Sequence, residues 1–89
     1  MAEPVIRGKV VDASTGEEII GATVLLKGST DRWTVTGLDG SFSIDAGVSS
    51  GILVCNLIGY KDIEISFTIP VEELRISMEP DIIMLDAAV

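Results

Sequence analysis

The stretch Thr36-Gly37-Leu38-Asp39-Gly40-Ser41-Phe42-Ser43-Ile44 is the most informative part of the chain. Its Asp39-Gly40 pair favours a tight turn, because both residue types tolerate positive φ at low steric cost. After this pair, apolar residues alternate with polar ones, as expected for a strand with one apolar face. Before it, positions 33–36 are β-branched or aromatic, which favours a strand. The centre of the chain therefore predicts a β-hairpin.

Other segments predict further strands around this hairpin, separated by turns rich in Gly, Asp and Ser. Pro70 and Pro80 end the last two strands, because proline lacks the N–H that a ladder needs. The segment 51–58 is almost wholly apolar, which predicts a central strand buried on both faces. The chain therefore predicts an all-β, seven-stranded antiparallel β-sandwich. Its expected core residues are Ile6, Val10, Val24, Leu26, Phe42, Ile44, Leu53, Cys55, Ile63, Ile65, Phe67 and Ile76.

Length and composition limit the function classes. A chain of 89 residues forms one domain with a modest core. Its net charge is -8 and its six basic residues are scattered, which disfavours nucleic acid and anionic membranes as partners. Apolar residues make up 47% of the chain, but the apolar runs are far shorter than the roughly 20 residues of a membrane-spanning helix. No signal peptide is expected, because no basic start precedes an apolar region.

The residue inventory argues against an enzyme. The chain has no His, which removes the commonest general base and metal ligand and excludes Ser-His-Asp and Cys-His arrangements. We expect no catalytic residue, no cofactor and no metal. Asp12, Asp39 and Asp45 lie near turns, but a calcium site needs several oxygens converging in one loop. Gly37 and Gly40 are assigned to the hairpin rather than to a phosphate-binding loop.

Three single residues have competing interpretations. The only cysteine, Cys55, lies in an apolar pattern and is predicted to be a buried core residue rather than a nucleophile. Trp33 is predicted to be a half-buried strand residue, with an exposed anchor for a partner or sugar as the alternative. Tyr60 is expected to pack against the core and cap it.

Several short motifs occur in one order along nearly the whole chain, and together they resemble a known family. They are Ile6-Arg7-Gly8-Lys9-Val10-Val11-Asp12, Gly16-Glu17, Gly21-Ala22-Thr23-Val24, Lys27-Gly28-Ser29, Thr34-Val35-Thr36, Leu38 to Ile44, Ile58-Gly59-Tyr60 and Leu85-Asp86-Ala87-Ala88-Val89. This set resembles the carboxypeptidase-regulatory-like domain, a transthyretin-like β-sandwich found ahead of the plug in Bacteroidetes TonB-dependent outer-membrane receptors of the starch-utilisation type. The chain departs from the family pattern at Ile19-Ile20 (Pro-Leu in the family), Gly37 (Asp), Asn56-Leu57 (Ser-Tyr) and Ala87-Ala88 (Glu-Val).

The resemblance implies a non-catalytic accessory domain on the periplasmic face of the bacterial outer membrane. Its parent would be a nutrient receptor for glycans, oligosaccharides or peptides, with the receptor's own plug and barrel as partners. Residues 1–80 would form the sandwich, in which Asp39, Gly40, Phe42, Gly59 and Tyr60 are structural motif residues. Transthyretin-like folds also include a hydrolase whose activity depends on His residues, and that activity does not carry over to a chain without His.

Residues 81–89 resemble the start of the plug and the TonB-box region. The resemblance implies that a TonB-type energy-transducing protein captures this segment by strand addition. The candidate partner-binding residues are Met84, Leu85, Asp86, Ala87, Ala88 and Val89. A tail that folds back over the sandwich competes with this interpretation, and a strand-paired or swapped dimer is plausible for the isolated domain. The alternative function is a surface-associated adhesion or carbohydrate-binding β-sandwich, which the scarcity of aromatic residues disfavours.

Overall fold

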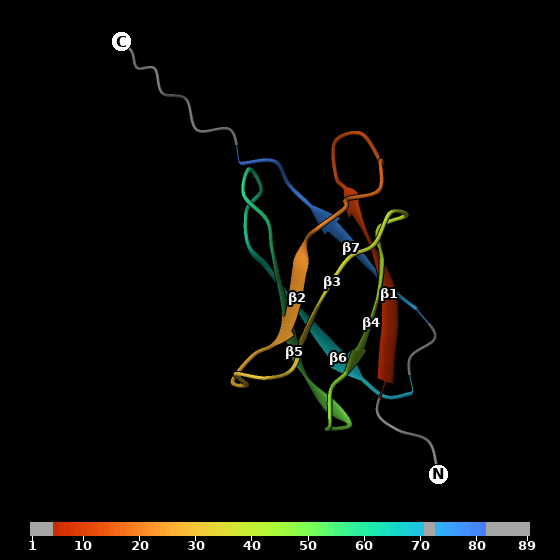
Figure 1. Cartoon of the computed structure of the whole chain (residues 1–89), viewed down its shortest axis with the longest axis vertical. Helices are drawn as coiled ribbons and strands as arrows, with labels where there is room; N and C mark the ends of the chain where they lie inside the picture. The colour runs from red at the N-terminus through yellow and green to blue at the C-terminus, as the bar shows by residue number, and fades with distance from the viewer. Residues whose placement is uncertain (1–4, 71–72, 82–89) are drawn as a thin grey trace.

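The structure is a computed structural model that describes residues 5–70 and 73–81. The described residues form seven β-strands and no helix, so no described segment could cross a membrane as a helix. This confirms the predicted all-β sandwich with seven strands (Figure 1). The strands are β1 (Val5–Asp12), β2 (Thr23–Leu26), β3 (Trp33–Val35), β4 (Ser41–Asp45), β5 (Ser50–Asn56), β6 (Ile63–Thr68) and β7 (Leu74–Met78).

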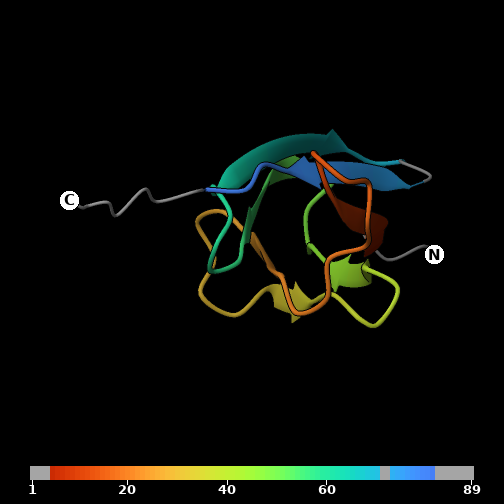
Figure 2. The same ribbon diagram turned by 90° about the horizontal axis from the view of Figure 1, so that it is seen from above.

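The strands form a three-stranded sheet in the order β4-β1-β7 and a four-stranded sheet in the order β3-β2-β5-β6. Viewed along the long axis, the two sheets enclose one interior (Figure 2). One pairing differs from the antiparallel prediction, because β1 and β7 run parallel, with Gly8 opposite Leu74 and Asp12 opposite Met78. The first and last strands can lie side by side in this way because the long connection between them passes through the other sheet.

The predicted hairpin at Asp39-Gly40 is wrong, although the turn itself is present. The Gly40 N–H donates to the Gly37 carbonyl over 2.9 Å, and Gly40 has φ +77°. However, β3 pairs with β2 and β4 pairs with β1, so this turn carries the chain from one sheet to the other. The Val10 N–H donates to the Gly40 carbonyl over 2.8 Å and thereby holds the turn against β1. The turn residues thus predicted the reversal of the chain but not which strands pair.

The core lies between the two sheets and contains the residues that the sequence predicted. Ten of the twelve are buried, whereas Ile63 and Ile65 on the edge strand β6 are half-buried and pack against the others. Thr36 is also buried, and its hydroxyl donates to the Ile19 carbonyl over 2.7 Å and accepts the Ala22 N–H over 2.9 Å. Further buried apolar residues are Val11, Ile19, Ala22, Ala46 and Met78.

The central strand β5 is covered on one face only, contrary to the predicted burial on both faces. Leu53 and Cys55 point into the core and are 0% exposed, whereas Ile52 and Val54 lie half-buried on the outer face. The strand ends at Asn56, so Ile58 belongs to the following loop, where it is 98% exposed. The apolar run is therefore shared between the core, an outer sheet face and a loop.

Candidate interaction surfaces

An apolar strip crosses the outer face of the four-stranded sheet. Leu25 on β2 lies opposite Trp33 on β3 and opposite Val54 on β5. The Trp33 side chain is 60% exposed and Val35 on the same strand is 45% exposed. The expectation of a half-buried Trp33 is therefore wrong, because β3 is a three-residue edge strand with nothing in the described structure packed over its outer side.

Asp12 and Tyr60 join the two sheets at the end of the sandwich where β1 finishes. The Tyr60 hydroxyl donates to Asp12 Oδ2 over 2.6 Å, while Asp12 Oδ1 accepts the Ser14 hydroxyl over 2.6 Å and the Ser14 N–H over 2.7 Å. The hydrogen bonds from Ser14, and next the one from Tyr60, lower the pKa of Asp12 to about 2. The bond to Asp12 raises the pKa of Tyr60. The expected capping role of Tyr60 thus includes a polar tie that sequence reasoning missed.

The other predicted motif residues have structural positions. Asp39 accepts the Ser41 hydroxyl over 2.5 Å and the Ser41 N–H over 3.1 Å, which lowers the pKa of the Asp39 carboxyl. Phe42 is buried, and its ring passes so close to Gly8 that a Cβ there would lie 2.6 Å from the ring. Gly59 has φ +95° in the loop between β5 and β6. These contacts stabilise the sandwich, and none of them brings two potentially catalytic side chains together.

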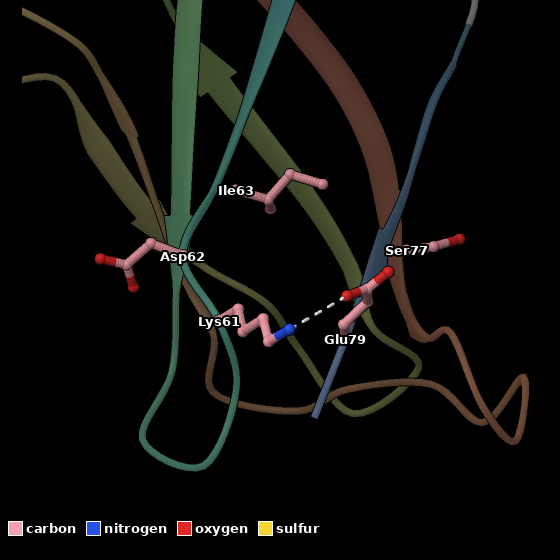
Figure 3. A pocket seen from close by; sticks show the side chains of 5 residues that line it. All are labelled: Lys61, Asp62, Ile63, Ser77 and Glu79. Carbon is pink, nitrogen blue, oxygen red and sulfur yellow. Dashed lines mark ion pairs between the residues drawn. The ribbon is translucent and has the colours of Figure 1, made fainter. Parts of the chain in front are cut away.

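The chain leaves the described structure along the same loop. The Lys61 N–H donates to the Glu79 carbonyl and the Asp81 N–H donates to the Gly59 carbonyl, both over 2.9 Å. Residues 79–81 therefore run from Lys61 towards Gly59, away from the strands and towards the loop end. A pocket of about 240 Å³ lies beside this pairing, with Lys61 Nζ and Glu79 Oε1 3.6 Å apart on its wall (Figure 3). Its volume is below the roughly 300–1,000 Å³ that is typical of small-molecule sites.

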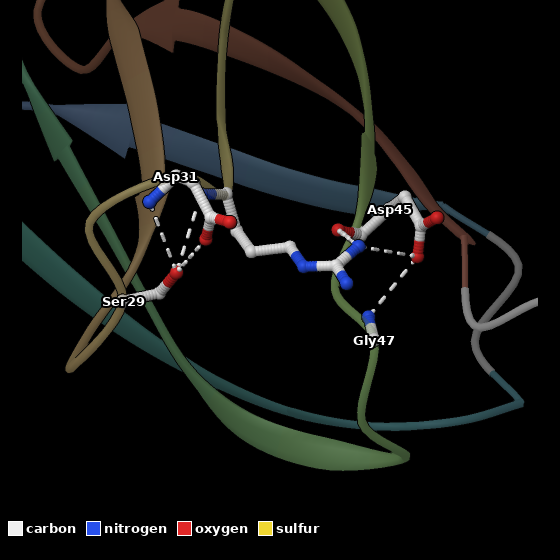
Figure 4. Close-up of polar contacts among 5 residues, drawn as sticks. Ser29, Asp31, Asp45 and Gly47 are labelled. Atoms are coloured by element: carbon white, nitrogen blue, oxygen red, sulfur yellow. Dashed lines mark hydrogen bonds and ion pairs between the residues drawn. The ribbon is translucent and has the colours of Figure 1, made fainter.

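Arg32 binds Asp45 and so joins the two sheets at the opposite end of the sandwich, beside the start of β1. Figure 4 shows the surrounding polar contacts of Ser29, Asp31, Asp45 and Gly47. Arg32 Nη1 donates to the Asp45 carbonyl over 3.2 Å and lies 3.3 Å from Asp45 Oδ1, which also accepts the Gly47 N–H over 3.1 Å. The Ser29 hydroxyl accepts the Arg32 N–H over 3.2 Å and so holds the start of β3. Because Arg32 and Asp45 are both substantially exposed, the ion pair contributes at most about 1 kcal/mol. Asp45, one of the three carboxylates near turns, therefore contacts Arg32 and Gly47.

Cys55 is fully buried, as predicted, and its thiol lies 3.5 Å from Met78 Sδ. Burial, and to a lesser degree the charge of Asp62, raises the pKa of the thiol to about 11. A thiol with such a pKa is a poor nucleophile at neutral pH. Within residues 5–70 and 73–81, no three carboxylate or thiol groups converge in a way that could hold a metal ion. The candidate tail residues Met84 to Val89 lie outside the described residues.

The fold and these contacts define a small all-β domain, and comparison with known proteins identifies its family. Residues 6–89 match the CarboxypepD_reg-like domain family, and the chain belongs to that family. It is also 34% identical over 84 residues to the TonB-dependent receptor SusC of Bacteroides thetaiotaomicron. That match includes 94% of this chain but only 8% of the relative. Both findings confirm the resemblance carried by the ordered motifs.

Proposed function

We propose that this chain is a non-catalytic domain on the periplasmic side of a TonB-dependent outer-membrane nutrient receptor, where it precedes the plug and barrel. The observation that carries the proposal is the 34% identity to such a receptor over 94% of the chain. The chemistry is consistent with it, since the chain has no His and its one cysteine is buried with a raised pKa. The domain would contribute protein contacts rather than a reaction.

We further propose that a TonB-type protein binds the tail, residues 81–89. Support comes from the last described residues, because the Asp81 N–H donates to the Gly59 carbonyl over 2.9 Å, which places Asp81 beside the loop at one end of the sandwich. Strand addition takes its affinity from backbone hydrogen bonds, so the segment needs free N–H groups. The proposed contact residues are Met84, Leu85, Asp86, Ala87, Ala88 and Val89.

The tail proposal is tested by titrating the isotope-labelled chain with the periplasmic C-terminal domain of TonB. We expect amide shifts confined to the tail, loss of those shifts in Leu85→Pro, which lacks the N–H, and their retention in the control Leu85→Val. Unchanged tail amides at saturating TonB would refute capture.

The role in the receptor is tested in cells by deleting residues 5–81 from the parent receptor. We expect slower uptake of the nutrient at an unchanged amount of barrel in the outer membrane. Uptake equal to that of the intact receptor would count against an accessory role.

A second candidate function follows from the exposed Trp33. A tryptophan that is 60% exposed on a sheet face can stack on a sugar ring or a protein, as a surface adhesion or carbohydrate-binding module would require. The intrinsic fluorescence of Trp33, the only tryptophan, tests this directly against a panel of soluble oligosaccharides. Saturable quenching that Trp33→Leu abolishes would support the module, and an unchanged emission would exclude sugar stacking.

A further inference from the structure

Three large apolar side chains are exposed on loops at one end of the sandwich. Ile58 is 98% exposed, Leu38 87% and Ile20 56%. They lie in the connections that follow β5, β3 and β1, respectively. Because strands alternate in direction along the chain, these three connections and the end of β7 share one end of the molecule (Figure 1). We call Ile20, Leu38 and Ile58 the loop-end surface.

Hydrogen bonds hold the backbone beneath this surface in place. The Gly21 N–H donates to the Thr36 carbonyl over 3.1 Å, which joins the Ile20 connection to that of Leu38. The Tyr60 hydroxyl on Asp12 joins the Ile58 loop to β1. Exposure of the three apolar side chains is therefore a property of the folded domain. A partner that covers them would remove apolar surface from water, which would stabilise the contact by about 25 cal/mol per Å² buried.

The charges around the loop-end surface are mostly negative. The segments 13–22, 36–40, 57–62 and 79–81 contain the acidic residues Glu17, Glu18, Asp39, Asp62, Glu79 and Asp81, and Lys61 is their only basic residue. Lys61 is already 3.6 Å from Glu79, and Lys9 on β1 lies 3.9 Å from Glu18, so acidic residues still outnumber basic ones here. At the opposite end, Lys27 and Arg32 partly balance the acidic residues. A partner that fits the loop-end surface therefore combines apolar residues with an excess of Lys and Arg.

The position at which the chain leaves the structure identifies the partner. Residues 79–81 pass along the Ile58 loop, so whatever follows Asp81 begins beside this surface. The receptor to which this chain is similar is far longer, since the match includes only 8% of it. A second copy fits poorly, because each chain carries a net charge of -8 and like charges repel at an acidic surface.

We propose that the loop-end surface docks against the following part of the same receptor chain, on a surface that presents apolar residues and clustered Lys or Arg. This inference rests on the proposed receptor function. Tethering makes a small interface sufficient, because a short linker supplies an effective concentration in the millimolar range. Three apolar side chains are far fewer than the roughly 20–30 residues on each side of a stable interface between separate proteins.

Site-directed photo-crosslinking in the full receptor, kept in outer-membrane vesicles, tests the proposal. Ile58→Cys carries a benzophenone maleimide, and Val48→Cys, at a 45% exposed position on the opposite end, is the matched control. The unsubstituted receptor measures background labelling, to which buried Cys55 contributes little. We expect crosslinks from position 58 to the following part of the same chain, several-fold above those from position 48. The yield should fall at about 1 M salt, where the Debye length is about 3 Å.

Equal yields from positions 58 and 48 would overturn the proposal, as would crosslinks from position 58 only to another protein or to a second copy. The deletion experiment on residues 5–81 remains independent of this outcome. If position 58 gives no crosslink while the deletion still slows nutrient uptake, docking is refuted and the receptor function stands. If the deletion has no effect and position 58 still crosslinks within the chain, the accessory role fails while the contact is real.

Discussion

Replacing Gly40 by alanine separates two costs that the turn imposes. Gly40 and Gly16 have nearly the same φ, +77° and +78°. A Cβ at Gly40 would lie 2.7 Å from the Val10 carbonyl oxygen, whereas a Cβ at Gly16 would meet nothing within 4 Å. Gly16→Ala therefore measures the backbone cost alone, and Gly40→Ala adds a clash with β1.

The magnitudes follow from these contacts. A left-handed backbone costs an alanine about 1–2 kcal/mol, and the reduced freedom of its unfolded chain offsets part of this. Gly16→Ala should thus lower the free energy of unfolding by about 1 kcal/mol. In Gly40→Ala the turn must also move away from Val10, which weakens the 2.8 Å hydrogen bond to the Gly40 carbonyl. Overpacking costs about 1–3 kcal/mol and a lost hydrogen bond about 1 kcal/mol, so the total should reach about 3 kcal/mol.

Urea denaturation monitored by circular dichroism measures both variants. With a slope near 1 kcal/mol/M, the midpoint should fall about 1 M for Gly16→Ala and about 3 M for Gly40→Ala. Equal midpoint shifts would refute the argument, because they would mean that Gly40 does not press against β1. A changed slope would show instead that the variant alters the unfolded state or the cooperativity.

Three further predictions concern the core and the polar tie. Phe42→Ala should cost about 3–5 kcal/mol in unfolding free energy, since the ring is buried, and a near-neutral urea midpoint would show that this ring does not carry the core. The depressed pKa of Asp12, about 2 against 3.8, means that its contribution is complete above about pH 4 and is lost as the pH falls towards 2. Tyr60→Phe should therefore reduce the loss of stability between about pH 4 and pH 2. An unchanged acid unfolding curve would mean that the hydrogen bonds from Ser14 alone lower the pKa of Asp12. Native Cys55 should react with a thiol reagent only as fast as the protein unfolds, and rapid labelling of the folded chain would contradict its burial.

Strand positions were predictable from the sequence because they depend on local alternation. Phe42 and Ile44 in β4 face the core, as the alternation after Asp39-Gly40 indicated. Strand pairing was not predictable in the same way. The residues around Asp39-Gly40 suit a reversal, but nothing within that stretch reveals that β3 and β4 belong to different sheets.

The interaction surfaces depend on contacts between distant segments. Asp12 and Tyr60 meet only because β1 and the loop after β5 end on the same side of the sandwich. The apolar run at 51–58 suggested burial on both faces, since apolarity alone does not distinguish a covered face from an exposed one. The exposure of Ile58 became visible only when β5 was seen to end at Asn56.

The parallel pairing of β1 with β7 has a consequence for how the domain folds. Gly8 finds its partner Leu74 only after nearly the whole domain is available, so one of the two ladders of the three-stranded sheet joins the first and last strands of the domain. Folding of such a topology is slow, because loop closure must precede the gain from the contact. Until β7 arrives, the sites of Ile76 and Met78, both 0% exposed in the folded domain, remain open to water. The core between the two sheets is therefore completed only when residues 74–78, the last strand of the domain, pair with β1.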